Sequence, residues 1–160
     1  MSKIIKKISC IDIGSNAIKY RQYRLLKNDS IELDTFKRIP LRLGADAFSL
    51  GKMSDKTYED FKWTLKKLKK HAMKKNSELL GIFATSAMRT FSNQSQILKK
   101  IKKDLNLKID ILSGREEASL LRYFEYKEFK KTQTLLVDVG GGSTETVSYT
   151  HLTLPTSRSV

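Results

Sequence analysis

The chain has 160 residues, of which 39% are hydrophobic and 30% are charged, and it carries a formal net charge of +14. A chain of this length forms one domain of ordinary size with a buried core, and its aliphatic content argues against a disordered polymer. The strong positive charge favours an acidic partner such as nucleic acid, an anionic membrane or a polyphosphate-like substrate. Lysine pairs on solvated helix faces explain the same charge equally well.

Cys10 is the only cysteine, which excludes an intrachain disulfide and a metal site built from several cysteines. No segment approaches the ~18 apolar residues of a membrane span. The basic start of the chain lacks the uninterrupted apolar core of a signal peptide. We therefore expect a cytoplasmic protein without a membrane partner.

The first half of the chain predicts a three-stranded antiparallel meander followed by a long helix. Stretches 8–14, 18–25 and 31–39 have the pattern of strands. Residues 41–51 show no clear period, so we expect an irregular connection there. Ser54 or Asp55 then caps a helix. Its buried stripe is expected at the positions that keep helical spacing, which are Tyr58, Phe61, Leu65, Leu68 and Ala72.

The second half of the chain predicts alternating strands and helices. Strands are expected at 79–84 and 108–112, helices at 92–105 and 113–124, and a final hairpin at 134–139 and 144–149. This order describes an α/β domain of residues 1–148 with a mixed sheet covered by helices. Residues 149–160 have no lysine and no clear period. We leave this atypical tail out of the fold prediction, as either a frayed end or an artefact of sequencing or assembly.

The stretch 135–145 predicts a phosphate site. An apolar strand carries Asp138, and residues 140–142, all glycine, then turn the chain into Ser143 and Glu145. Glycines allow the backbone to bring several N–H groups close to an anion. Asp138 and Glu145 offer the oxygen ligands of a divalent cation that neutralises the same anion. For this stretch alone, a tight glycine hairpin with a solvated aspartate is an equally good interpretation.

A second copy of the pattern lies near the N-terminus, where an apolar strand is followed by Asp12, Gly14, Ser15 and Asn16. Two such hairpins suggest two walls of one phosphate site. Ligands of open α/β sheets bind at the carboxyl ends of the strands. The polar residues expected at such ends are Asp12, Thr85, Ser113 and Asp138.

The sequence lacks the residues that several other kinds of binding or catalytic site require. The chain has no GxxxxGK[ST] loop and no dinucleotide-binding fingerprint. His71 lies on a lysine-rich helix and His151 lies in the tail, which argues against a zinc site, a histidine base and a serine-hydrolase triad. Carboxylates, glycine turns and an arginine remain. Transfer of a phosphoryl group to water requires this set of groups.

Two adjacent glutamates compete for the role of the base that activates water. With Ser113 as the N-cap, Glu116 is used in a capping box. Glu117 lies about 100° further round the helix and projects into the cleft, so we expect Glu117 to be the base. Alternatively, both glutamates only complement the helix dipole. Arg89 follows a strand end and is expected to bind phosphate; a surface ion pair is its alternative.

Five motifs follow one another along the chain and together span it up to Ser148. They are Asp12-Ile13-Gly14-Ser15-Asn16, Pro40-Leu41-Arg42-Leu43-Gly44, Ala84-Thr85-Ser86-Ala87-Met88-Arg89 with Asn93, Ser113-Gly114-Arg115-Glu116-Glu117-Ala118, and Asp138-Val139-Gly140-Gly141-Gly142-Ser143-Thr144-Glu145. In this order they resemble the exopolyphosphatase / guanosine-pentaphosphate phosphatase family. Each motif alone is weak, and the combination is highly specific.

The resemblance implies an actin-like ATPase-superfamily domain of the ribonuclease H-like class. It also implies Mg²⁺-dependent hydrolysis of the terminal phosphate of polyphosphate or of pppGpp, a nucleotide of the stringent response. By resemblance, Glu117 and Glu145 are catalytic, and Asp138 and Glu145 hold the metal. The residues implied in phosphate binding are Asp12, Gly14, Ser15, Asn16, Arg89, Gly141, Gly142 and Ser143.

The chain departs from the family pattern in three respects. Ala17 stands where the family often has serine, and Lys19 where arginine is usual, which keeps the charge but loses the guanidinium fork. Family members also carry a second domain of the same fold, with the active cleft between the two domains, and we expect this chain to stop after the first. At full length the resemblance suggests a homodimer.

Two other functions remain open. A non-catalytic sensor of phosphate or (p)ppGpp would use the same loops for binding alone. A basic nucleic-acid binder rests on charge alone, because the chain lacks the alternation of aromatic and basic residues that forms a stacking platform. We therefore expect polyphosphate or a guanosine phosphate as the partner, and no nucleic acid.

Overall fold

The fold begins with a β-meander, as predicted. The computed structural model describes residues 3–121, 134–149 and 156–159. Strands β1 (Ile4–Ile13), β2 (Ala17–Leu26) and β3 (Ile31–Pro40) pair antiparallel in sequence order. Strands β4 (Ser77–Ala84) and β5 (Asp110–Ile111) then add parallel to β1. The resulting order β3-β2-β1-β4-β5 forms a five-stranded sheet, which is mixed as the sequence predicted.

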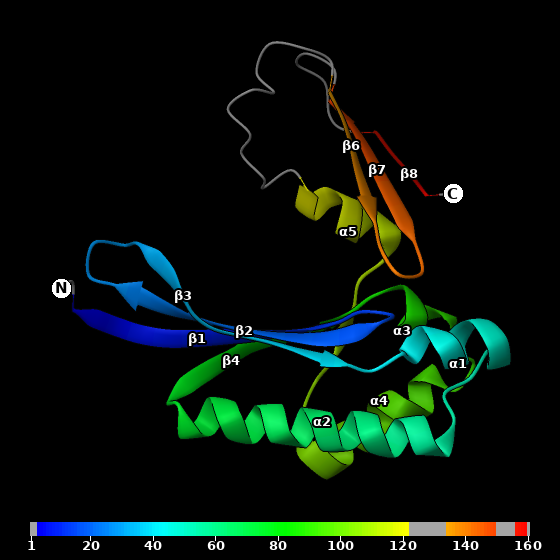
Figure 1. The fold of residues 1–160 in the computed structure, drawn as a ribbon, viewed down its shortest axis with the longest axis horizontal. Coiled ribbons are helices and arrows are strands. Elements are labelled where there is room, and N and C mark those ends of the chain that lie inside the picture. Colours follow the sequence, from blue (N-terminus) through cyan, green and yellow to red (C-terminus); the bar gives the residue numbers. More distant parts are fainter. Residues whose placement is uncertain (1–2, 122–133, 150–155, 160) are drawn as a thin grey trace.

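Helices α2 (Asp55–Lys74) and α4 (Gln94–Leu105) cover one side of this sheet (Figure 1). Ser54 caps α2 by accepting a hydrogen bond from the Thr57 backbone N–H. The predicted stripe of α2 is buried in the core together with alternate residues of the central strands, such as Ile11 and Ile13. The lysines of α2 fall largely outside this stripe and are mostly exposed.

Helix α1 (Leu43–Leu50) replaces the irregular connection expected at 41–51, and that prediction is wrong. Leu43 and Ala47 lie four residues apart, and both are buried in the core. Gly51 ends the helix in the left-handed region with φ 64°. The N-cap residue Arg42 makes no side-chain capping hydrogen bond. Tertiary packing therefore stabilises this short helix, and local sequence gives little sign of it.

Two short helices follow the parallel strands at their carboxyl ends. Helix α3 (Ser86–Thr90) follows β4, and helix α5 (Gly114–Leu120) follows β5. The sequence predicted that the helix after Ser113 continues to Phe124; residues 122–133 lie outside the described residues. Helix α5 lies on the side of the sheet opposite to α2 and α4 (Figure 1).

The final hairpin belongs to a sheet of its own. Strands β6 (Thr134–Val139) and β7 (Thr144–Tyr149) have the predicted bounds, and β8 (Thr156–Ser159) pairs antiparallel with β7. The order β6-β7-β8 repeats the connectivity of β1, β2 and β3, with a glycine turn between the first two strands in each case. The tail that was left out of the prediction thus contributes a strand.

Among the described residues, no helix is long and apolar enough to span a bilayer.

The packing of α2 yields the first prediction. Phe61 is 0% exposed in the centre of the core, whereas Trp63 on the same helix is 57% exposed. We expect Phe61→Ala to lower the free energy of unfolding by about 3–5 kcal/mol, because it leaves a cavity. Trp63→Ala, a matched aromatic truncation, is expected to change it by less than about 1 kcal/mol. Chemical denaturation measures both values, and equal losses would contradict the assigned core.

Candidate active site

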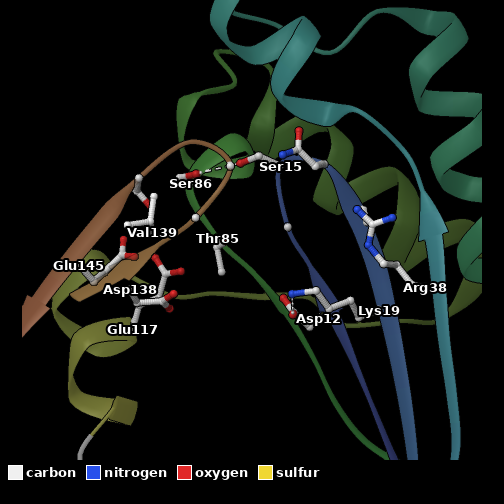
Figure 2. A pocket seen from close by; sticks show the side chains of 16 residues that line it. Asp12, Ser15, Lys19, Arg38, Thr85, Ser86, Glu117, Asp138, Val139 and Glu145 are labelled. Atoms are coloured by element: carbon white, nitrogen blue, oxygen red, sulfur yellow. Dashed lines mark hydrogen bonds and ion pairs between the residues drawn. The ribbon is translucent and has the colours of Figure 1, made fainter. Parts of the chain in front are cut away.

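A polar cavity of about 330 Å³ opens where the two sheets meet at the carboxyl ends of β1, β4 and β6. Side chains from both glycine hairpins, from α5 and from the start of α3 face into it (Figure 2). The strand ends therefore converge as the sequence predicted, with Ser113 as the exception. The lining residues are Asp12, Gly14, Ser15, Asn16, Ala17, Lys19, Arg38, Thr85, Ser86, Glu117, Asp138, Val139, Gly140, Gly141, Ser143 and Glu145.

The first hairpin joins β1 to β2 and forms one wall. The backbone N–H of Gly14 donates to the carbonyl of Ala17 at 3.1 Å, which closes the turn. Asp12 and Lys19 lie opposite each other on the two strands and form an ion pair of 3.2 Å. The charge of Asp12 is therefore balanced by Lys19 within the same hairpin.

The second hairpin joins β6 to β7 and forms the facing wall. Here the Gly140 N–H donates to the Ser143 carbonyl at 2.8 Å, in the same pattern as in the first turn. Asp138 lies opposite Glu145, so the position that Lys19 holds in the first hairpin carries a carboxylate in the second. Glu145 is only 7% exposed. Like charges placed directly opposite each other destabilise a strand pair unless a third group compensates them.

Two glycines of the second turn lie against the side chains of Ser15 and Asn16 in the first turn. A Cβ on Gly141 would lie 2.3 Å from Nδ2 of Asn16, and a Cβ on Gly142 would lie 2.8 Å from Oγ of Ser15. Ser15 is buried, and its hydroxyl shares a 3.0 Å hydrogen bond with that of Ser86. The missing side chains thus leave room for this close approach. This approach brings the two walls of the cavity together.

Glu117 reaches the cavity because of how α5 begins. Ser113 caps the helix: its hydroxyl accepts from the Glu116 N–H, and the Glu116 carboxylate accepts from the Ser113 N–H at 2.7 Å. The predicted capping box is therefore confirmed. Glu116 is exposed at the helix end, while the next residue, Glu117, turns into the cavity, as the helix geometry predicted.

The surroundings of Glu117 favour its protonated form. Burial raises the pKa of Glu117 above the ordinary value of a glutamate, and the negative charges of Glu145 and Asp12 raise it further. A hydrogen bond and the positive charge of Arg89 oppose this shift. A carboxylate whose pKa is raised toward neutrality is a better proton acceptor in catalysis than an ordinary surface glutamate.

Arg89 holds Glu117 rather than facing the cavity directly. Its Nη1 donates to Oε2 of Glu117 at 2.5 Å and also to the carbonyl of Leu112, and Arg89 is not among the lining residues. The arginine thereby ties the end of β5 to the carboxylate on α5. Its expected contact with phosphate stays a prediction.

Asp138 and Glu145 are the residues best suited to a metal ion. No group of three or more acidic, cysteine or histidine side chains is close enough to hold a metal within the described part of the chain. Mg²⁺ is usually held by one or two carboxylates together with waters and substrate phosphates, so it does not require such a group. Asp138 and Glu145, opposite each other on β6 and β7, supply two carboxylates at the cavity wall. The donor set therefore fits Mg²⁺.

A profile of the Ppx/GppA phosphatase family matches residues 32–160. The chain belongs to this family. An exopolyphosphatase 1 of Mycobacterium tuberculosis is 25% identical over 144 residues, which cover 89% of this chain and 42% of that protein. A guanosine-5'-triphosphate,3'-diphosphate pyrophosphatase of Photobacterium profundum is 29% identical over 140 residues, which cover 87% of this chain and 28% of that protein. The chain thus spans less than half the length of these curated relatives.

Solved structures share the fold. The crystal structure of an exopolyphosphatase from Cytophaga hutchinsonii matches 97% of this chain and 50% of its own chain, with a TM-score of 0.83 and 22% sequence identity. Together with the β3-β2-β1-β4-β5 order, this match confirms the predicted ribonuclease H-like, actin-like fold class.

Most residues that the Ppx/GppA motifs implied come together around the cavity. Gly142, which lies close to Phe48 and Ser15, and Arg89, which contacts Glu117, do not line the cavity. Sequence reasoning did not find Arg38 and gave Ser86 no role beyond its motif. Only the strand register could have pointed to Arg38, which lies opposite Lys19. The predicted residues that line the cavity are Asp12, Gly14, Ser15, Asn16, Glu117, Asp138, Gly141, Ser143 and Glu145.

The contact between Arg89 and Glu117 gives a prediction for the pKa of Glu117. Because the Arg89 contact stabilises the ionised carboxylate, Arg89→Gln is expected to raise the pKa of Glu117 further. Carboxyl-carbon NMR of labelled glutamate in the full-length protein measures this pKa. Arg115→Gln on the exposed side of α5 is the control and should leave it unchanged. A pKa of Glu117 that is unchanged or lowered in Arg89→Gln would contradict the assigned contact.

Proposed function

We propose that the full-length protein carrying this chain hydrolyses the terminal phosphoanhydride bond of inorganic polyphosphate, of pppGpp, or of both, with Mg²⁺. The observation that carries the proposal is the position of Glu117, a carboxylate with a raised pKa that faces the cavity between two glycine hairpins. The names of the curated relatives, an exopolyphosphatase and a guanosine pentaphosphate pyrophosphatase, support this choice of substrate class.

In the proposed reaction, Glu117 accepts a proton from a water molecule. The oxygen of that water forms a bond to the terminal phosphorus, and the bridging P–O bond on the far side breaks. Orthophosphate and the shortened chain are the products, and the proton on Glu117 returns to solvent. Backbone N–H groups of the two glycine turns bind the phosphate oxygens. Asp138 and Glu145 would hold Mg²⁺, which neutralises phosphate charge and lowers the pKa of water.

The base role of Glu117 is tested against its neighbour. Glu117→Gln is expected to lower the rate of phosphate release by roughly 10²–10⁴-fold, the usual contribution of a general base. Glu116→Gln is the matched control, because glutamine keeps the capping box and Glu116 is not among the lining residues. In the wild type, the rate should fall toward low pH with a midpoint above the ordinary glutamate pKa of about 4.3.

Equal rates for the wild type and Glu117→Gln would remove Glu117 from the mechanism. Tight binding of (p)ppGpp without turnover by the wild-type full-length protein would favour the sensor function instead.

The proposed metal site gives a separate prediction. Chelation of divalent ions should abolish phosphate release, and Asp138→Asn should raise the Mg²⁺ concentration that gives half-maximal rate by roughly 10-fold or more. Asp110→Asn is the control, since Asp110 on β5 forms an ion pair with Lys108 and does not line the cavity. Titration of the rate with Mg²⁺ measures this. The same half-saturation in wild type and Asp138→Asn would show that Asp138 holds no metal.

A cytoplasmic location, a homodimer and a role in the stringent response stay predictions.

A further inference from the structure

Resting on the proposed function, we propose that Arg38 binds the part of the phosphate chain beyond the bond that is cleaved. In this arrangement Arg38 sets the direction in which the substrate lies in the cavity. The ligand chemistry is a run of phosphoanhydride groups, which linear polyphosphate and a nucleotide pentaphosphate share.

Arg38 is a charged side chain that faces the cavity and has no partner among the described residues. It lies near the end of β3 and lines the cavity next to Lys19, its opposite residue on β2. Lys19 is engaged by Asp12, whereas the guanidinium of Arg38 makes no hydrogen bond or ion pair to any described residue. Like charges directly opposite each other on neighbouring strands repel, and in the described part of the chain only Lys19 of these two cations has a carboxylate beside it. A bound anion would relieve this repulsion.

The cavity thus has two poles. Figure 2 shows Glu117, Asp138 and Glu145 gathered on one side of it, with Lys19 and Arg38 on the other. The acidic pole suits a phosphoryl group that arrives with a divalent cation. The basic pole suits phosphate oxygens without a metal, which a guanidinium binds through two parallel N–H donors. A phosphate chain satisfies both poles only if its terminal group lies at Glu117 and its remainder points to Arg38.

The cavity is large enough for this arrangement. A volume of about 330 Å³ corresponds to roughly ten water molecules at about 30 Å³ each. This space exceeds what one phosphate group fills. The remaining groups of a longer chain would leave the cavity past the ends of β2 and β3, where Arg38 lies.

The strand itself supplies a matched control. Lys37 precedes Arg38 on β3, carries the same charge, lies opposite Tyr20 on β2 and is not among the residues that line the cavity. Since successive residues of a strand point to opposite faces, Lys37→Gln removes the same charge from the same strand without reaching the site. Thermal unfolding of both variants checks that the fold is intact.

The experiment measures KM and kcat of the full-length protein with linear polyphosphate in one arm and pppGpp in the other. Arg38→Gln is expected to raise KM by roughly 10-fold or more, the usual effect of losing a charged hydrogen bond, with a much smaller change in kcat, and Arg38→Lys should recover part of the loss. Lys37→Gln should change KM by less than twofold. An effect in one arm alone identifies that compound as the chain bound at Arg38.

Equal KM values for Arg38→Gln and Lys37→Gln in both arms would overturn the inference while leaving the hydrolase proposal intact. If the wild type releases no phosphate, the hydrolase proposal fails, and calorimetric binding of polyphosphate to the same variants still decides the role of Arg38. Weaker binding by Arg38→Gln alone would support it, and equal binding by both variants would overturn it.

Discussion

The contact between two glycine turns is the constraint on which the site depends. A Cβ on Gly141 would overlap the side chain of Asn16, and a Cβ on Gly142 would overlap those of Phe48 and Ser15. The turns belong to different sheets, and their contact joins the walls of the cavity at the strand ends. Because each turn follows a strand with an aspartate two residues before its first glycine, the contact also brings Asp12 and Asp138 to a common space.

Local patterns were sufficient to predict most of the fold. The stripe from Tyr58 to Ala72 and the hairpin of β6 and β7 were found because burial and strand pairing follow simple periods. Helix α1 was missed because it has only 8 residues, begins at Leu43-Gly44 and lacks a side-chain cap. Strand β8 was missed because its sequence Thr-Ser-Arg-Ser has no apolar alternation and it pairs through its backbone with β7.

The parts of the candidate site that lie within one turn of the chain could be predicted from the sequence. The contacts that depend on pairing between distant segments could not. The capping box at Ser113 and Glu116 is local, and it was enough to separate the directions of Glu116 and Glu117. The hydrogen bond from Arg89 to Glu117 joins residues 28 positions apart in the sequence. The neighbourhood of Lys19 and Arg38 follows from the β2–β3 register, which a bulge between Gln22 and Tyr23 shifts. No local period encodes such a shift.

In the proposed arrangement, both hairpins enclose one phosphoryl group, with a divalent cation on the side of β6 and β7. Anomalous scattering from Mn²⁺ in crystals of the full-length protein with bound phosphate would locate both groups. We expect one metal peak between the carboxylates of Asp138 and Glu145, and a phosphate between this metal and the first glycine turn. A phosphate bound away from either turn, or a metal bound elsewhere in its presence, would show that the two hairpins do not form one phosphate site.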